Sequence, residues 1–481
     1  MTDRDLLTAK IQSYLKALSP RAVETLVRGL ERARQAGKTD PHLDLILAAS
    51  AELLRSDDPP PAAFRGPAPA APATRKGHLE RLFFSPLDTF LVNEQLPYKQ
   101  AGRVYRPYLN GIWQWLERDL LPADIARTRQ DLDTIRSDAE KVHARVAVLR
   151  RQAADALGEA ISRAEGSERE ARRLAMVLGG DRAVADLQDV TRVLQAEPWL
   201  PAFLRRMPPN LTERRLKQDT DVLALVEAHA RKHPDYVPVL AAAVLDRADA
   251  PWSLGTFATR LAGTQKMKDL AQSRFAPFVD MVVSEAERLN VLAKDHQRHN
   301  PDPVAFSEAV SSYATLLKGL ELDLDLTGCD QWKARISHTR RDMSHLVADE
   351  LQGASGAVRR ALAVPKVDRD GNWTRDEAAV DAAVRVLRLL AMARGNSETL
   401  AVNEVSKRAR HTVEQTLEIL TRALISDLRK QSGPMRDAHL FAIDTAVLLA
   451  EVYFGPDYAA QIRRSRQAAV AATAPGPASA A

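Results

Sequence analysis

Apolar side chains recur at helical spacing along most of the chain. Between residues 122 and 157 an apolar or small residue returns at every seventh position, and a second set follows three positions later: Ile125, Leu132, Ala139, Val146 and Ala153, then Ile135, Val142, Leu149 and Ala156. This repeat predicts one long helix over 122–157 with a narrow apolar seam, suited to a coiled coil or a long helical hairpin. Residues 397–430 are also amphipathic and predict a second long helix.

Turn residues divide the remaining pattern into shorter helices. Segments such as KHPDY, HNPDP and FGPDY combine Pro with other turn-forming residues, and they separate helices of roughly 12–20 residues. No run of alternating β-branched residues reaches the length of a strand. We therefore predict an all-α protein, a multi-helix array of helical hairpins or bundles that is either solenoid-like or irregular. No fixed repeat assigns it to a repeat family.

Composition shifts suggest five segments. Residues 1–56 predict a small N-terminal three-helix module, and residues 57–75 (DDPPPAAFRGPAPAAPATR) predict a Pro/Ala-rich linker. An aromatic-rich irregular segment plus a helix follows at 76–121, and the helical array occupies 122–466. We expect residues 467–481, which end in APGPASAA, to form a disordered tail.

Residues 81–121 hold eight of the 25 aromatic residues, with Lys99, Arg103 and Arg106 between the tyrosines. These rings could pin an irregular loop onto the helices, anchor a protein partner, or stack on single-stranded nucleic acid. All three interpretations stay open from the sequence. The candidate partner-binding residues in this segment are Lys99, Arg103, Tyr105, Arg106, Tyr108 and Trp113.

The net charge of +5, with a pI near 9.2, is a mild basic bias that permits an acidic partner. The basic cluster most suited to such a partner is RRSR at 463–466, which adds Arg463, Arg464 and Arg466 to the candidate residues. A single cysteine, Cys329, excludes an intramolecular disulfide and a multi-cysteine zinc site, and its scarcity is typical of a reducing compartment.

The sequence favours a cytoplasmic protein without a membrane span. The N-terminal MTDRDLL lacks an apolar signal core. The longest apolar helix candidate, residues 440–454, is short and contains Asp444 and Glu451. We predict that it is a buried core helix.

Residues 323–327, Asp-Leu-Asp-Leu-Thr, resemble the nucleophile motif of haloacid-dehalogenase-type phosphotransferases. The resemblance implies Asp323 as nucleophile, Asp325 as acid–base partner and Thr327 as a phosphate contact. That chemistry needs a preceding buried parallel strand, whereas AVSSYATLLKGLE has a helical pattern. We therefore predict a helix that ends here and is capped at Gly328. Its packing residues would be Leu320, Leu322, Leu324 and Leu326.

Residues 368–377 (DRDGNWTRDE) have acidic and amide side chains at alternate positions, as calcium loops do. An EF-hand needs Gly at its sixth position and Glu at its twelfth, where this chain has Trp373 and Ala379. Thr374 and Glu377 instead predict a capping box that opens a helix.

Histidines occur at helical spacing in three places, which could place ligands for a metal on one face. These are His229 with His233, His296 with His299, and His338 with Asp342 and His345. The first two pairs stand where helices end before proline, a position that favours histidine without any metal. We predict no bound metal or cofactor.

Residues 400–425 resemble a winged-helix DNA-reading core at Glu404-Val405 and Thr412-Val413. That motif needs a turn between two helices, and no residue between these landmarks breaks a helix. We predict one continuous helix.

These observations favour a non-enzymatic helical scaffold or regulatory protein that acts through protein–protein contacts. A nucleic-acid-binding protein that uses Arg-bearing faces and residues 99–108 is the alternative, and a metal- or phosphate-dependent helical enzyme is a second alternative. The sequence leans against an enzyme, identifies no protein partner, and leaves the oligomeric state open.

Overall fold

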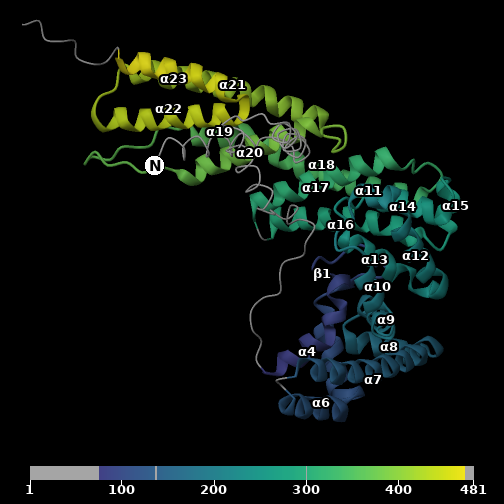
Figure 1. The fold of residues 1–481 in the computed structure, drawn as a ribbon. Coiled ribbons are helices and arrows are strands. Elements are labelled where there is room, and N and C mark those ends of the chain that lie inside the picture. Colours follow the sequence, from purple (N-terminus) through teal and green to yellow (C-terminus); the bar gives the residue numbers. More distant parts are fainter. Residues whose placement is uncertain (1–74, 136–137, 300, 472–481) are drawn as a thin grey trace, which may run out of the picture. The chain divides into compact units, whose positions relative to one another are not determined.

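The computed structural model describes residues 75–135, 138–299 and 301–471, and there the chain is an all-α array of helices (Figure 1). This confirms the predicted fold class. The only strands in the described part are β1 (Leu91–Val92) and β2 (Val104–Tyr105), which pair in parallel. The predicted module at 1–56, the linker up to residue 74 and the tail beyond residue 471 lie outside the described residues.

The first group of helices is built around α7, which packs against α4, α6, α8 and α9. The group consists of α4 (Arg75–Phe84), the 3₁₀ helix η2 (Ser85–Phe90), α5 (Tyr108–Trp115), the π-helical turn η3 (Leu116–Leu120), α6 (Pro122–Thr134), α7 (Ala139–Gly166), α8 (Glu168–Leu178) and α9 (Asp181–Gln195). Its core contains a cluster of rings in which Phe83 lies 5.0 Å from Phe84 and 5.3 Å from Trp113 between ring centroids. These side chains supply apolar area that alanine-rich helices lack.

The second group is built around α16, whose neighbours α13, α14, α17 and α18 bury most of its surface. Its elements are α10 (Leu200–Arg206), α11 (Glu213–Gln218), α12 (Thr220–Lys232), the 3₁₀ helix η4 (Pro234–Tyr236), α13 (Val237–Arg247), α14 (Ser253–Ala262), α15 (Met267–Gln272), α16 (Ala276–Arg298), α17 (Pro303–Asp323) and α18 (Asp330–Gln352). A helix covered on several sides has apolar residues around most of its circumference, as α16 does.

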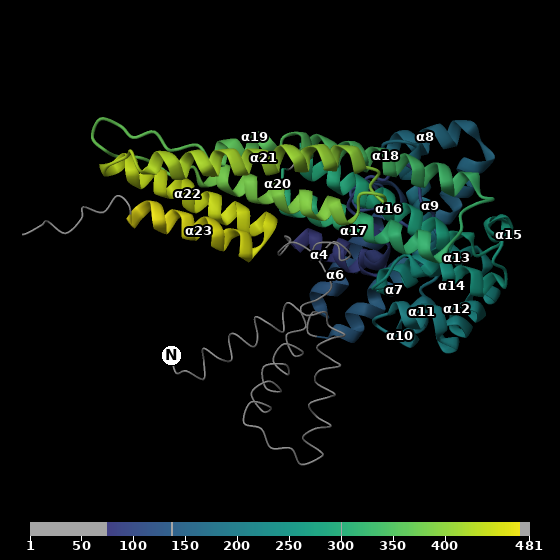
Figure 2. The same cartoon turned by 90° about the horizontal axis from the view of Figure 1, so that it is seen from above.

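The third group contains the C-terminal helices of the described chain. These are α19 (Ala354–Ala361), α20 (Glu377–Gly395), α21 (Asn403–Leu428), α22 (Gly433–Phe454) and α23 (Pro456–Ala471). Helix α22 packs against α20, α21 and α23, and the last three helices run side by side in both views (Figure 2). The predicted core helix at 440–454 forms the last two thirds of α22, where Ile443, Ala446 and Leu449 are fully buried.

The prediction of one helix over 122–157 is wrong, because the segment forms two helices. Helix α6 ends at Thr134 and α7 begins at Ala139, and the two pack against each other. The Asp138 carboxylate accepts a hydrogen bond from the Lys141 amide at 3.1 Å. The first backbone amides of a helix have no acceptor within the helix. An aspartate just before the helix accepts a hydrogen bond from one of them and so stabilises its start. The seven-residue apolar pattern gives no sign of such a cap, because the cap does not change the spacing of the apolar residues.

Other boundaries also differ from the predictions. Helix α21 starts at Asn403, and residues 397–402 form a turn in which Ala401 has a left-handed φ of 54°. Helix α23 extends to Ala471, so residues 467–471 are helical where a disordered tail is predicted. The N-cap of α20 is Asp376 and not the predicted Thr374. The Asp376 carboxylate accepts a hydrogen bond from the Ala379 amide at 2.9 Å.

The described helices were also compared with the length and hydropathy that a membrane span requires. None of those in residues 75–471, outside the gaps at 136–137 and 300, is both long enough and apolar enough.

Candidate functional site

Residues 93–108, called the tyrosine loop below, connect β1 to the start of α5 and lie over α9, α13 and α16. At the bend of the loop, Gly102 has φ +83°, and a Cβ added there would lie 2.4 Å from the Pro238 carbonyl oxygen. Only glycine combines this backbone angle with such a close approach to a neighbouring main chain. The loop is therefore seated directly on α13.

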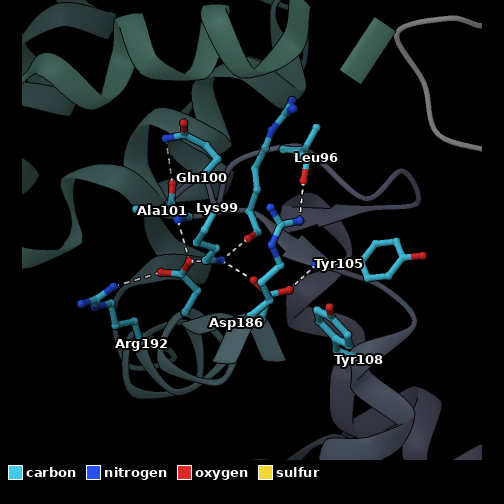
Figure 3. A network of polar contacts seen from close by, with 12 residues as sticks. Leu96, Lys99, Gln100, Ala101, Tyr105, Tyr108, Asp186 and Arg192 are labelled. Atoms are coloured by element: carbon cyan, nitrogen blue, oxygen red, sulfur yellow. Dashed lines mark hydrogen bonds and ion pairs between the residues drawn. The ribbon is translucent and has the colours of Figure 1, made fainter. Parts of the chain in front are cut away.

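Lys99 joins the tyrosine loop to α9 (Figure 3). Its Nζ lies 2.5 Å from Asp186 Oδ1 and 2.6 Å from Asp189 Oδ2, and it donates to the Arg103 carbonyl at 2.5 Å. The two carboxylates are 5% and 2% exposed, whereas the Lys99 side chain is 26% exposed. Asp186 also accepts from the Tyr105 amide at 2.7 Å. Buried carboxylates are stable only when paired in this way.

Asp189 has a second role at the bend, where it accepts from the Gly102 amide at 3.0 Å and pairs with Arg192 at 3.0 Å. Burial raises the pKa of Asp186, and Lys99 together with the Tyr105 amide opposes that rise. Both aspartates thus hold the loop's backbone as well as its lysine. A segment with little regular secondary structure gains fixed hydrogen-bond acceptors by this arrangement.

A second set of charges joins the loop to α16. Arg103 Nη2 lies 2.6 Å from Glu285, and Arg288 lies 2.7 Å from the same carboxylate and 3.0 Å from Glu94. Burial alone raises the pKa of Glu285, but Arg288 and Arg103 outweigh it and lower this pKa to about 2. Glu285 is therefore ionised at neutral pH and forms ion pairs with two arginines.

The ring of Tyr98 rests against α18. The Arg335 guanidinium lies 5.7 Å from the Tyr98 ring centroid, and Arg335 donates to Glu287 at 2.7 and 2.9 Å. Asp280 accepts from Trp332 Nε1 at 2.8 Å and also contacts Arg335. The Tyr98 ring therefore lies against an arginine that carboxylates hold, while 51% of Tyr98 stays exposed.

A small pocket of about 30 Å³ opens between the loop and α9. Its lining includes Tyr98, Tyr105, Tyr108, Lys99 and Arg182. The rings of Tyr105 and Tyr108 form a T-shaped pair with centroids 5.1 Å apart. This volume admits one or two water molecules, or the tip of a side chain, and is too small for a substrate of ordinary size.

The predicted residues of this segment have different surroundings. Lys99 and Arg103 pair with carboxylates of α9 and α16. Tyr105 and Tyr108 are half-buried, Arg106 is exposed with a 2.8 Å hydrogen bond to Asn93, and Trp113 lies in the core. The structure brings the loop residues together around one surface but places Trp113 behind it.

The predicted C-terminal cluster lies on α23, more than 300 residues further along the chain than the tyrosine loop. Arg463 pairs with Glu451, Arg466 pairs with Asp444 at 2.7 Å, and Arg464 is exposed.

The acidic partners of the loop were missed by sequence reasoning. Asp186 and Asp189 stand three positions apart among the buried residues Leu187 and Val190 of α9, and Glu285 stands on the buried side of α16. Carboxylates at core positions of an amphipathic helix are rare unless they have partners. A charged residue at an apolar position of the helical pattern was therefore the signal in the sequence that could have revealed these partners.

The phosphotransferase-like motif is a helix terminus, as predicted. Asp323 is the last residue of α17 and pairs with Lys217 at 2.7 Å, and Asp325 accepts from the Thr327 amide at 3.0 Å. The predicted cap at Gly328 is wrong, because the C-cap of α17 is the extended residue Leu324, and Gly328 lies in the turn before α18 with a left-handed φ of 94°. The predicted leucine packing is right for Leu320 and Leu324, which are buried, and wrong for Leu322, which is 78% exposed.

The histidine and winged-helix patterns also have a structural explanation. His233 stacks on Trp199 with 4.4 Å between centroids, and burial lowers the His233 pKa. Within the described residues, no three His, Cys, Asp or Glu side chains come close enough together to hold a metal ion. Residues 403–425 lie within the uninterrupted helix α21, which confirms the prediction of one helix between the winged-helix landmarks.

Compared with known proteins, the chain matches no family model, and no curated protein and no solved structure is significantly similar to it.

Proposed function

We propose that this protein is a helical scaffold and that the exposed side of the tyrosine loop holds a protein partner. The observation that carries the proposal is Tyr98, which exposes half of its surface while its ring lies against Arg335. Tyrosine and arginine are enriched among the residues that dominate binding at protein interfaces. A ring that already has a contact on one side loses less conformational entropy when a partner covers the other.

The surroundings of Tyr98 support a protein partner more than a nucleic acid. Lys99 and Arg103, two of the three cations that lie between the tyrosines, are engaged by buried carboxylates of α9 and α16. Arg106 and the edges of Tyr105 and Tyr108 remain at the surface. This mixture of aromatic area and few available charges is typical of the centre of a protein interface. We expect the partner to be cytoplasmic, as the cysteine usage suggests.

Photo-crosslinking tests this proposal directly. A benzoyl-phenylalanine placed at Tyr98 in the chain's own cells should give a discrete protein adduct after irradiation. The same analogue at Phe454, an exposed ring on α22, serves as the matched control and should not give that adduct. Adducts with nucleic acid in place of protein, or identical adduct patterns at both positions, would contradict the proposal.

The identified partner then allows a quantitative test. Tyr98→Ala should weaken its binding about 30-fold, equivalent to about 2 kcal/mol. Phe454→Ala should leave the affinity within about twofold, as expected for a residue outside the interface. An unchanged affinity for Tyr98→Ala would remove the loop from the binding surface.

A further inference from the structure

A larger pocket opens on the C-terminal helices, between the turn at 373–375, α20 and α22. Its volume is about 450 Å³, within the range of ligand-binding clefts. The apolar part of its lining consists of Trp373, Val380, Leu440, Phe441 and Leu448. Leu448 is 44% exposed, although its neighbours Val447 and Leu449 are buried.

One face of α22 carries alternating acidic and apolar residues into this pocket. Asp437, Phe441, Asp444 and Leu448 are spaced by four, three and four positions, so they lie along one side of the helix. Asp444 pairs with Arg466 at 2.7 Å. In the described part of the chain no ion pair reaches the exposed Asp437. The face offers apolar contacts between carboxylates.

The facing helix adds further negative charge. Glu377 and Asp381 flank Val380 on α20, and both are exposed. The pocket lining itself contains Asp437, Asp444 and one cation, Arg375. With Glu377 and Asp381 next to Val380, carboxylates outnumber cations around the pocket although the whole chain has a net charge of +5. Complementary charge selects the partner of a surface and speeds its association more than it adds affinity.

The protein already places one cation on this surface. The Arg375 guanidinium lies 5.3 Å from the centroid of the Phe441 ring, and the Trp373 ring lies 5.7 Å from the same centroid. Aromatic rings beside carboxylates bind guanidinium and ammonium groups through their negative faces. Arg375 thus shows within the chain what chemistry the pocket accepts.

We propose that this pocket docks a basic amphipathic helix of a partner protein. The apolar side of such a helix would cover Leu448 and Phe441, and its lysines or arginines would meet Asp437 and the acidic residues of α20. Helices bind grooves in this way through apolar anchors spaced three and four residues apart. The surface is separate from the tyrosine loop, so this proposal does not rest on the function proposed above.

Designed peptides test the proposal with the full chain. A labelled amphipathic Leu/Lys helix and a Leu/Glu helix of the same length are titrated with protein, and fluorescence anisotropy reports binding. We expect the Leu/Lys peptide to bind at least about tenfold more tightly, because its charges complement the carboxylates around the pocket. Equal binding of the two peptides would overturn the proposal.

Surface variants localise the binding. Leu448→Lys and Asp437→Lys should each weaken the Leu/Lys peptide about tenfold or more, because each places a positive charge in the pocket. Ile419→Lys, a change at a residue of α21 that is 65% exposed and lies outside the pocket lining, should stay within about twofold. Equal losses in all three variants would show unspecific attraction and would refute the proposal.

Sedimentation velocity tests the other possible occupant of the pocket, a second copy of this chain. We expect wild type and Leu448→Lys to sediment alike. A wild-type dimer that Leu448→Lys converts to a monomer would assign the pocket to self-association and overturn the proposal. Circular dichroism of each variant verifies that the helical content is unchanged.

Discussion

At the residue scale, Gly102 determines whether the tyrosine loop can sit on α13. We expect Gly102→Ala to lower the free energy of unfolding by about 3 kcal/mol, since it combines a left-handed φ with a clash against a main-chain carbonyl. Gly263→Ala is the matched control, because its φ of 65° is also left-handed but its Cβ would meet open space. That variant should lose about 1 kcal/mol. Urea unfolding measures both, and equal losses would contradict the clash at Pro238.

Glu285 predicts a distinct dependence of stability on pH. Its pKa is about 2 in the folded chain and 4.5 in an ordinary glutamate, so its ionised form stabilises the fold above about pH 4.5. This contribution is lost as the pH falls through about 2. Glu285→Gln leaves Arg103 and Arg288 without their shared carboxylate and should cost about 3 kcal/mol at pH 7.

The comparison of wild type with Glu285→Gln isolates this residue from other titrating groups. Asp186 has a raised pKa and acts in the opposite direction, but it is present in both proteins. The difference in unfolding free energy should therefore shrink between pH 4.5 and pH 2. A difference that stays constant over this range would show that Glu285 is not held ionised by the arginines.

At the scale of elements, two glycines let α14 and α17 approach closely. A Cβ on Gly319 would lie 2.3 Å from Trp252 Cγ, and a Cβ on Gly255 would lie 2.3 Å from Leu324 Cδ1. Gly319→Ala should lower the stability by about 2 kcal/mol, because the root of a tryptophan ring must move. Gly158→Ala in α7 should instead raise it by about 0.5–1 kcal/mol, since its nearest neighbour is 3.4 Å away. Thermal unfolding of both variants measures these opposite signs.

The elements also show which features a single sequence can predict. Helical periodicity and turn residues were sufficient for the fold class, for the uninterrupted helix after Asn403 and for the helix terminus at Asp323. The break between α6 and α7 was missed because no Pro or Gly marks it. Its local signal was the Asp138 cap, which acts through one hydrogen bond and leaves the hydrophobic pattern intact.

At the scale of the whole molecule, the paired charges connect parts of the chain that are far apart in sequence. Arg103 and Glu285 are 182 residues apart, and Gly102 and Asp189 are 87 apart. Sequence reasoning selected Lys99 and Arg103 as candidates because they lie between tyrosines. Their carboxylate partners depend on how distant helices pack, which one sequence does not specify, so the inward direction of both cations could not be predicted.

Removal of Lys99 should loosen one region of the molecule selectively. Lys99→Ala leaves Asp186 and Asp189 buried without their shared cation, and breaking such a buried pair is strongly destabilising. We expect the backbone amides of residues 93–106 and of α9 to exchange hydrogen at least about tenfold faster, while those of α22 stay unchanged. Hydrogen exchange read by mass spectrometry resolves these segments.

Lys430→Ala is the control for that experiment, because it removes the same side chain from an exposed pair with Asp427. Exposed pairs contribute little, so its exchange pattern should match that of wild type. Uniform acceleration in Lys99→Ala along the whole chain would contradict a local role of Lys99.

The enclosure of Glu285, Asp186 and Asp189 also determines how the protein responds to concentrated salt. Dissolved ions screen charges that water reaches, with a Debye length of about 3 Å at 1 M, but they screen enclosed pairs far less. A high-salt wash should therefore strip ligands held by surface charge and leave the tyrosine loop in place. Whatever stays bound to the loop after such a wash is held by contact with its rings.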